Sequence, residues 1–257
     1  MEVEVENLED ITKLRKIESY YNERARTQDS VNASGQWGTK ERVPLICEEI
    51  CNKVRLSNEN IVLEIGCGSG VLGNEILNKC KYYAGIDLSF EMLKKFLYDS
   101  TKPNLVQASA GALPFRDNYF NLVMINSVTM YMTKDLILEM LSESERVVSS
   151  QSVIFMGENI TPSRYYWEFT WFQNLTPAKQ IFAKIYIKIR KYLASKNSKF
   201  GNKWADLYNE LSPEFIKKYF AGKGEVDISD AAAYTVRQRI LGNAKGNRRV
   251  DFLIRLY

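Results

Sequence analysis

Residues 61 to 70, Ile-Val-Leu-Glu-Ile-Gly-Cys-Gly-Ser-Gly, decide the fold of this chain. The branched apolar side chains before the first glycine, interrupted only by Glu64, are typical of a parallel strand covered on both faces. Gly66, Gly68 and Gly70 can adopt a positive φ and let the backbone come close to a ligand. A helix expected to begin at Val71 would point its free N–H groups and its dipole at this loop. The stretch therefore predicts a strand, a tight turn and a helix N-terminus that together hold a small charged cofactor.

Further apolar stretches follow and alternate with amphipathic segments of helical spacing. The expected strands are 82–87, 104–108, 120–126 and 152–158. Strands and helices that alternate in this way predict a parallel sheet with helices on both faces. Such sheets bind ligands at the carboxyl ends of their strands. The glycine loop, Asp87, Ser109 and Asn126 all fall at or just past such ends. The pattern 234–241 and 248–256, separated by Gly-Asn-Ala-Lys-Gly-Asn, predicts a C-terminal hairpin that adds an antiparallel strand.

Composition narrows the class of protein. The 257 residues include 45% hydrophobic and 26% charged residues, which is ordinary for a soluble globular protein, and the net charge of +4 is too small to predict nucleic-acid binding. The acidic N-terminus lacks the pattern of a signal peptide, and no apolar run approaches the ~18 residues of a membrane span. The four cysteines have neither zinc spacing nor a paired framework. We expect a cytoplasmic protein.

The chain contains no histidine. This absence excludes Ser-His and Cys-His nucleophilic machinery and argues against a catalytic zinc or non-haem iron site. We therefore expect no metal, and any enzymatic reaction must proceed without imidazole as its general base.

The glycine loop alone leaves more than one cofactor class open. Gly68-Ser-Gly70-Val-Leu-Gly73 satisfies the dinucleotide fingerprint, and Asp87 lies where that fingerprint has its ribose-binding acid. A nicotinamide or flavin site is one interpretation, and a tight strand–helix turn without any ligand is another.

Three motifs in order narrow the choice: Glu-Ile-Gly-Cys-Gly-Ser-Gly (64–70), Gly-Ile-Asp-Leu-Ser (85–89) and Ala-Ser-Ala-Gly-Ala-Leu-Pro-Phe-Arg-Asp-Asn-Tyr-Phe-Asn-Leu-Val (108–123). Over residues 43–157 the chain resembles the class I S-adenosylmethionine-dependent methyltransferases. It is most similar to their small-molecule branch, which includes the ubiquinone and menaquinone C-methyltransferases. Ala-Leu-Pro-Phe followed by a strand is not part of the dinucleotide fingerprint, so the resemblance favours S-adenosyl-L-methionine. It implies an α/β, Rossmann-like fold with a seven-stranded, mostly parallel sheet, an antiparallel C-terminal strand and a helical cap.

The resemblance also implies a binding role for particular residues. Asp87 would accept hydrogen bonds from the ribose hydroxyls, and Glu64 would order the ammonium group of the cofactor. Leu88 and Met92 would pack on the adenine, although Met92 also suits a plain core. The implied cofactor-binding set is Glu64, Gly66, Cys67, Gly68, Gly70, Asp87, Leu88, Met92, Ser109, Ala110, Asn126, Ser127, Tyr21 and Arg24. Ser109 and Asn121 stand where relatives often carry acids, which weakens individual contacts but not the choice of cofactor.

The remaining segments are expected to cover the core. We divide the chain into an N-terminal helical lid (1–42), a cofactor-binding core (43–158), an aromatic and basic helical cap (159–223) and C-terminal strands (224–257). Tyr21 and Arg24 resemble a segment that folds over the cofactor, but they equally suit a helix packed on the core, and Trp37 would belong to the same lid. The cap carries twelve Lys/Arg against four Asp/Glu, a charge of +8. Its basic amphipathic helix suits a solvated face, a peripheral membrane or lipid contact, or an acidic substrate.

These observations predict a methyltransferase that acts on a small molecule. Methyl transfer from a sulfonium is an in-line displacement, so positioning of the acceptor can supply most of the catalysis. If a general base is needed, the candidates are Tyr21, Tyr131 and Glu158. Two other hypotheses remain: an RNA methyltransferase that binds through the +8 segment, and a methyltransferase-like protein that binds without catalysis. The acceptor atom and the oligomeric state are left open.

Overall fold

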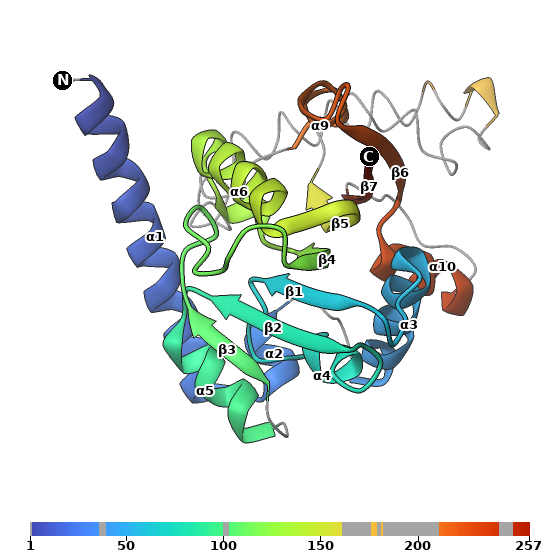
Figure 1. The fold of residues 1–257 in the computed structure, drawn as a ribbon. Helices are drawn as coiled ribbons and strands as arrows, with labels where there is room; N and C mark the ends of the chain where they lie inside the picture. The colour runs from blue at the N-terminus through green and yellow to red at the C-terminus, as the bar shows by residue number, and fades with distance from the viewer. Residues whose placement is uncertain are drawn as a thin grey trace.

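One mixed seven-stranded sheet forms the centre of the molecule (Figure 1). The computed structural model describes residues 2–35, 40–99, 103–160, 176–178, 181, 211–241 and 249–257. The strands are β1 (Ile61–Ile65), β2 (Tyr82–Asp87), β3 (Asn104–Gln107), β4 (Phe120–Asn126), β5 (Val148–Ile160), β6 (Gly224–Asp230) and β7 (Arg249–Leu256). Their order across the sheet is β3-β2-β1-β4-β5-β7-β6. Five neighbouring strands are parallel, and β7 runs antiparallel between β5 and β6. The predicted Rossmann-like class I fold is confirmed.

The first strand lies at the point where the order of the sheet reverses. β1 pairs with β2 on one side and with β4 on the other, both parallel. The carboxyl ends of these three strands therefore meet at one edge, where the connections leave in opposite directions and a crevice opens. The residues that end the three strands are Ile65, Asp87 and Asn126.

Helices cover both faces of the sheet. The helical elements are α1 (Glu2–Thr27), α2 (Ser30–Ser34), η1 (Lys40–Arg42), α3 (Val43–Val54), α4 (Gly73–Ile76), α5 (Phe90–Asp99), η2 (Thr129–Tyr131), α6 (Lys134–Val147), α9 (Pro213–Tyr219) and α10 (Ala232–Leu241). Side chains alternate along each strand, so Leu63 and Ile65 pack toward α6 and α9 in one core, while Val62 packs toward α3 and α10 in the other. Two hydrophobic cores with the sheet between them are the arrangement expected for α/β proteins.

The long N-terminal helix stands at the edge of this body (Figure 1). Its first turns project outward, while its C-terminal half packs against α5 and α2. Ala25 of α1, Ala33 of α2 and Met92 of α5 form a small buried cluster, against which Tyr21 also packs. The helix is therefore attached through α5 and α2, and Leu14 also packs against the core on the α6 face of the sheet.

Two sequence-based predictions about elements were wrong. The helix expected over 71–80 is reduced to the four residues of α4, since Gly73, Asn74 and Asn78 are poor helix formers. The strand expected at 234–241 is the helix α10, and its place in the sheet is taken by β6. The carboxylates of Asp251 and Glu158 accept hydrogen bonds from the first N–H groups of α10, at Ala232 and Ala233. These contacts come from distant parts of the chain, so the local pattern did not contain them.

Several predicted features lie outside the described residues. They are the aromatic cluster at 165–172, most of the basic stretch that follows it, and Trp37. Within the described ranges, every helix is too short or too polar to span a bilayer.

Gly70 tests whether the glycine loop packs as tightly as its geometry requires. Gly66, Gly68 and Gly70 all have positive φ, as predicted, and a Cβ on Gly70 would lie 2.1 Å from Phe96 Cδ2. Gly222 has nearly the same φ, +77° against +78°, but a Cβ there would meet no neighbouring atom within 4 Å. We expect Gly222→Ala to lower the free energy of unfolding by about 1–2 kcal/mol, the cost of the left-handed backbone.

Gly70→Ala carries the same backbone cost and also the overpacking against Phe96, so its loss should exceed that of Gly222→Ala by about 1–3 kcal/mol. Denaturant titration of both variants measures the difference. Equal losses would show that Phe96 moves aside freely and that the loop does not depend on this contact.

Candidate functional site

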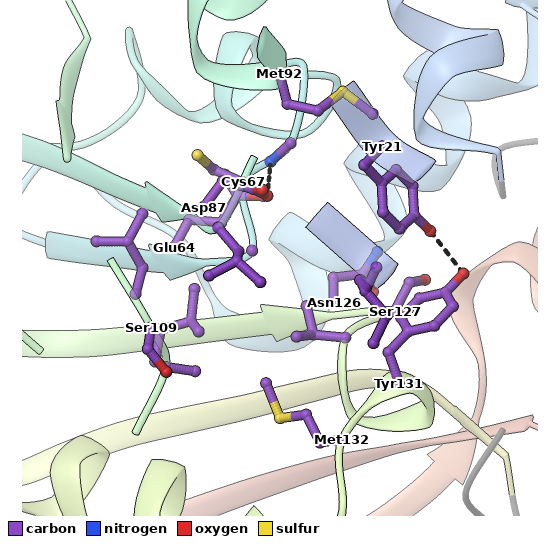
Figure 2. Close-up of a pocket in the computed structure, with 18 of the residues that line it drawn as sticks. Tyr21, Glu64, Cys67, Asp87, Met92, Ser109, Asn126, Ser127, Tyr131 and Met132 are labelled. Atoms are coloured by element: carbon purple, nitrogen blue, oxygen red, sulfur yellow. Dashed lines mark hydrogen bonds between the residues drawn. The ribbon is translucent and has the colours of Figure 1, made fainter. Parts of the chain in front are cut away.

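An open pocket lies where the carboxyl ends of β1, β2 and β4 meet, and α1 forms one of its walls (Figure 2). Concave sites at this edge of an α/β sheet are where such folds bind small molecules and cofactors. The lining brings together residues from the glycine loop, from the ends of three strands and from the N-terminal helix. The predicted binding residues among them are Tyr21, Glu64, Gly66, Cys67, Gly68, Asp87, Leu88, Met92, Ser109, Ala110, Asn126 and Ser127.

Asp87, the last residue of β2, ties the glycine loop to the start of α5. Its Oδ2 accepts a hydrogen bond from the Gly68 N–H at 2.9 Å, and its Oδ1 accepts one from the Ser89 N–H at 2.8 Å. Burial raises the pKa of Asp87, and the hydrogen bonds from these N–H groups oppose that rise. Each carboxylate oxygen has a further lone pair. Asp87 is therefore a fixed acceptor whose remaining lone pairs are available to a ligand with hydroxyl groups.

Glu64 is a buried acid inside β1, only 3% exposed. Its Oε2 accepts a hydrogen bond from the Tyr83 hydroxyl at 2.5 Å. Burial raises the pKa of Glu64 to about 8, and the nearby charge of Asp87 adds to the rise, while the Tyr83 hydrogen bond opposes it. Burial and the presence of a second acid in the pocket disfavour ionisation of these carboxylates. A cationic ligand would stabilise their ionised forms, so the pocket favours such a ligand.

The end of β4 presents two polar atoms to the same pocket. Asn126 Oδ1 and Ser127 Oγ are buried and have no hydrogen-bond partner within the described part of the chain. Ser127 also has a φ of +62°, which is unusual for a residue with a side chain. Buried polar atoms nearly always have a hydrogen-bond partner. These two atoms are therefore the features of the pocket that most directly indicate a polar ligand.

A less polar wall completes this side of the pocket. Leu88, Met92, Cys67 and Ala110 line it, together with Ser109. The Ser109 hydroxyl accepts a hydrogen bond from the Gly111 N–H at 3.3 Å and so supports the turn after β3. Burial holds the pKa of the Cys67 thiol well above its usual value, so this thiol remains protonated. The wall suits a flat, largely apolar group.

Two tyrosines from separate elements meet in the lining of the pocket (Figure 2). The hydroxyl of Tyr21 on α1 donates to the hydroxyl of Tyr131 on η2 at 2.6 Å, and the two rings meet edge to face. Both residues line the pocket. This hydrogen bond joins α1 to the segment after β4.

Three residues predicted for the site do not line the pocket. Gly70 packs on Phe96 beneath the loop instead. The guanidinium of Arg24 donates to the carbonyl oxygens of Ala33 and Asn32 and to the Tyr20 hydroxyl, so it fixes α2 rather than facing the pocket.

Glu158 is the third residue placed elsewhere, and its prediction as a general base at the pocket needs correction. Its Oε1 accepts the Ala233 N–H at 3.1 Å, and its Oε2 forms an ion pair with Arg249 at 3.4 Å. The carboxylate thus holds α10 and β7 together, beside the buried pair of Asp251 with Lys53, and Glu158 is not among the residues that line the pocket.

The pocket also contains residues that sequence reasoning missed. Leu14 and Ile17 of α1, Ser34 of α2, and Val128 and Met132 after β4 all line it. Leu14, Ile17 and Tyr21 follow one another at helical spacing, and this apolar stripe was the available signal. Nothing local in the sequence marks the other three.

Comparisons with known proteins agree with this geometry. A family model described as "Methyltransferase domain" matches residues 63–156. A protein of Methanococcus maripaludis named "Probable cobalt-precorrin-6B C(15)-methyltransferase (decarboxylating)" is 35% identical over 133 residues, which are 47% of this chain and 70% of that protein. An uncharacterised methyltransferase of Schizosaccharomyces pombe is 40% identical over 52 residues, but the match covers only 20% of each chain. The 18S rRNA (guanine-N(7))-methyltransferase of Mus musculus is 39% identical over 61 residues, 23% of this chain and 22% of that protein.

Solved structures show the same fold at low sequence identity. Phosphoethanolamine N-methyltransferase 1 of Haemonchus contortus, in complex with phosphoethanolamine and S-adenosylhomocysteine, has a TM-score of 0.66 at 12% identity, covering 96% of this chain and 49% of that one. A Haloferax volcanii methyltransferase in complex with the activator Trm112 has a TM-score of 0.60 at 12% identity, covering 92% and 97%. With the matched methyltransferase domain and the archaeal relative, these findings place the chain in the class I S-adenosylmethionine-dependent methyltransferases, whose methyl donor is S-adenosyl-L-methionine.

Proposed function

We propose that this protein transfers a methyl group from S-adenosylmethionine to a small-molecule acceptor. The observation that carries the proposal is the pocket itself, in which the acids and unpaired polar atoms of the sheet edge adjoin an apolar and tyrosine-lined wall from α1 and η2. One side suits the cofactor, and the other offers space to an acceptor that reaches it past the Tyr21–Tyr131 bridge.

The residues present fit the cofactor. S-adenosylmethionine has a zwitterionic amino-acid end with an ammonium and a carboxylate, a sulfonium, a ribose diol and an adenine. Asp87 would accept the ribose hydroxyls, since its carboxylate is held in place but not saturated. Glu64, with the unpaired atoms of Asn126 and Ser127, would hold the amino-acid end. Leu88 and Met92 would pack on the adenine, with Ser109 and Ala110 at its edge.

The bound cofactor would supply an electrophilic methyl group on sulfur, and the protein has to place the acceptor in line with it. An approach of about 3–3.5 Å between nucleophile and methyl carbon is the geometry that favours such a displacement. The apolar side chains Leu14, Ile17 and Met132 would exclude water from the acceptor side. Tyr21 and Tyr131 remain the candidates for orienting the acceptor or accepting its proton, because their hydroxyls lie at the pocket and Glu158 does not.

An RNA acceptor is the alternative to be tested, because one relative is named as an rRNA methyltransferase and the 159–223 segment has a charge of +8. We expect label from methyl-tritiated S-adenosylmethionine to enter the low-mass fraction of a cell extract and to resist ribonuclease. A parallel reaction on purified RNA should stay at background. Labelling confined to RNA, with RNA binding that weakens steeply with salt, would replace the small-molecule proposal.

Replacement of Asp87 tests the ribose assignment. Asp87→Ala should weaken S-adenosylmethionine binding by about 1.5–3 kcal/mol, the scale of hydrogen bonds to a charged group. Calorimetric titration measures it, with Asp227→Ala as the control, because Asp227 is 63% exposed at the sheet edge. Unchanged affinity in Asp87→Ala, with the control also unchanged, would mean that another group binds the ribose.

Glu64 gives the binding a defined pH dependence. With a pKa of about 8 in the free protein, Glu64 is mostly protonated near pH 6, whereas the ammonium of the cofactor favours the ionised form. Binding should therefore release a proton, and the affinity should rise with pH by up to about tenfold per unit between about pH 6 and 7.5. The upper limit reflects the α-amino group, which itself loses its proton near ~7.8.

The Glu64→Gln variant isolates this effect. It should bind more weakly near pH 7.5 and should show a flatter pH profile than the native protein, since Gln does not titrate. Calorimetry in buffers of different ionisation enthalpy counts the protons released by each protein. The same slope and the same proton count in both would exclude Glu64 as the ammonium partner.

A further inference from the structure

We propose that Asn22 of α1 is a positioning residue that couples the docking of the lid helix to the cofactor-binding carboxylate of Asp87. The inference rests on the proposed role of Asp87 and adds a residue that does not line the pocket. Ser89 provides the coupling, because it forms hydrogen bonds with both Asn22 and Asp87.

The first step is the double role of Ser89. Its backbone N–H donates to Asp87 Oδ1 at 2.8 Å, and its hydroxyl donates to Asn22 Oδ1 at 2.7 Å. The same hydroxyl accepts the Met92 N–H at 3.2 Å, so Ser89 caps α5. Ser89 is 1% exposed, so these contacts are made away from water. A shift of Ser89 would therefore move the carboxylate of Asp87 and the start of α5 together.

The second step is that Asn22 completes this cap from another helix. Its Oδ1 also accepts the Glu91 N–H at 3.2 Å, so two donors at the start of α5 converge on one amide oxygen. The first N–H groups of a helix have no partner within the helix. The amide of Asn22 thus satisfies a group that would otherwise need water when α1 is docked.

The third step is that the same segment of α1 closes the pocket. Tyr21, next to Asn22, lines the pocket and reaches Tyr131 on the far side. Met92, the residue whose N–H binds Ser89, packs with Ala25 of α1. A docked α1 therefore orders Asp87 and encloses the pocket at once, and by thermodynamic linkage a ligand on Asp87 must stabilise the docked helix in return.

Two variants separate this role from a general effect on folding. Asn22→Leu removes the acceptor oxygen at similar size, while Asn22→Asp keeps an acceptor oxygen at a helix N-terminus, where negative charge is favourable. Glu23→Gln, at the neighbouring exposed position of the same helix, is the matched control. Ser89→Ala removes the other partner of the same hydrogen bond.

We expect Asn22→Leu to weaken S-adenosylmethionine binding by about five- to tenfold, the scale of losing one helix cap, and Asn22→Asp to restore it. Hydrogen exchange in residues 12–27 should slow on addition of S-adenosylmethionine in the native protein, in Glu23→Gln and in Asn22→Asp, but not in Asn22→Leu. The double variant Asn22→Leu/Ser89→Ala should lose less affinity than the sum of the two single losses, because both substitutions remove the same Ser89–Asn22 hydrogen bond.

The inference is overturned if Asn22→Leu binds with native affinity and retains cofactor-dependent protection of α1, while Asp87→Ala loses binding. It is also overturned if the effects of Asn22→Leu and Ser89→Ala add fully. If Asp87→Ala binds normally, the ribose assignment itself fails, a result distinct from failure of the coupling alone. If Asn22→Leu does not fold, Ser89→Ala takes its place in the test. Its S-adenosylmethionine affinity and the hydrogen exchange of its α1 are then compared with those of Asn22→Asp.

Discussion

The hydrogen bonds that the carboxylate of Asp87 accepts hold the functional end of this molecule together. One oxygen fixes the Gly68 N–H in the loop after β1, and the other fixes the Ser89 N–H at the start of α5. The backbone of the loop also bonds to β2, since the Gly66 and Cys67 N–H groups donate to the Ile86 carbonyl. The Asp87 side chain extends this connection to the helix, so that both sides of the pocket are tied to the end of one strand. Gly68 itself has a positive φ, +53°, a conformation that glycine adopts readily.

The electrostatics of the pocket follow from where the two acids lie. Glu64 and Asp87 both have a raised pKa, chiefly because burial removes water from their carboxylates. Hydrogen bonds from backbone N–H groups stabilise the ionised form of Asp87, whereas the partner of Glu64 is a neutral tyrosine hydroxyl. A positive charge near Glu64 would therefore be favourable, because it would stabilise the ionised carboxylate that burial disfavours. A sulfonium cofactor with an ammonium group matches this asymmetry, and an anionic dinucleotide does not.

Much of the fold and of the candidate site could be predicted from the sequence, and the features that could not be predicted have a common physical cause. The strand 61–65, its glycines and Asp87 were predictable because burial and backbone geometry restrict those positions to few residue types. The helix at 232–241 was not, because its start is capped by Asp251 and Glu158 from other strands. The same holds for Arg24, since the carbonyl groups that bind it belong to α2. In each case a contact between separate elements determined the outcome, and local pattern does not encode such contacts.

The central claim is that the loop after β1 and the acid ending β2 form an S-adenosylmethionine site. Isothermal titration calorimetry of the purified protein with S-adenosylmethionine, S-adenosylhomocysteine and NADH tests it most directly. The structure predicts saturable binding of the first two at one site per chain and no heat with NADH. Binding of NADH in place of S-adenosylmethionine, or no binding of either at tens of micromolar protein, would contradict it.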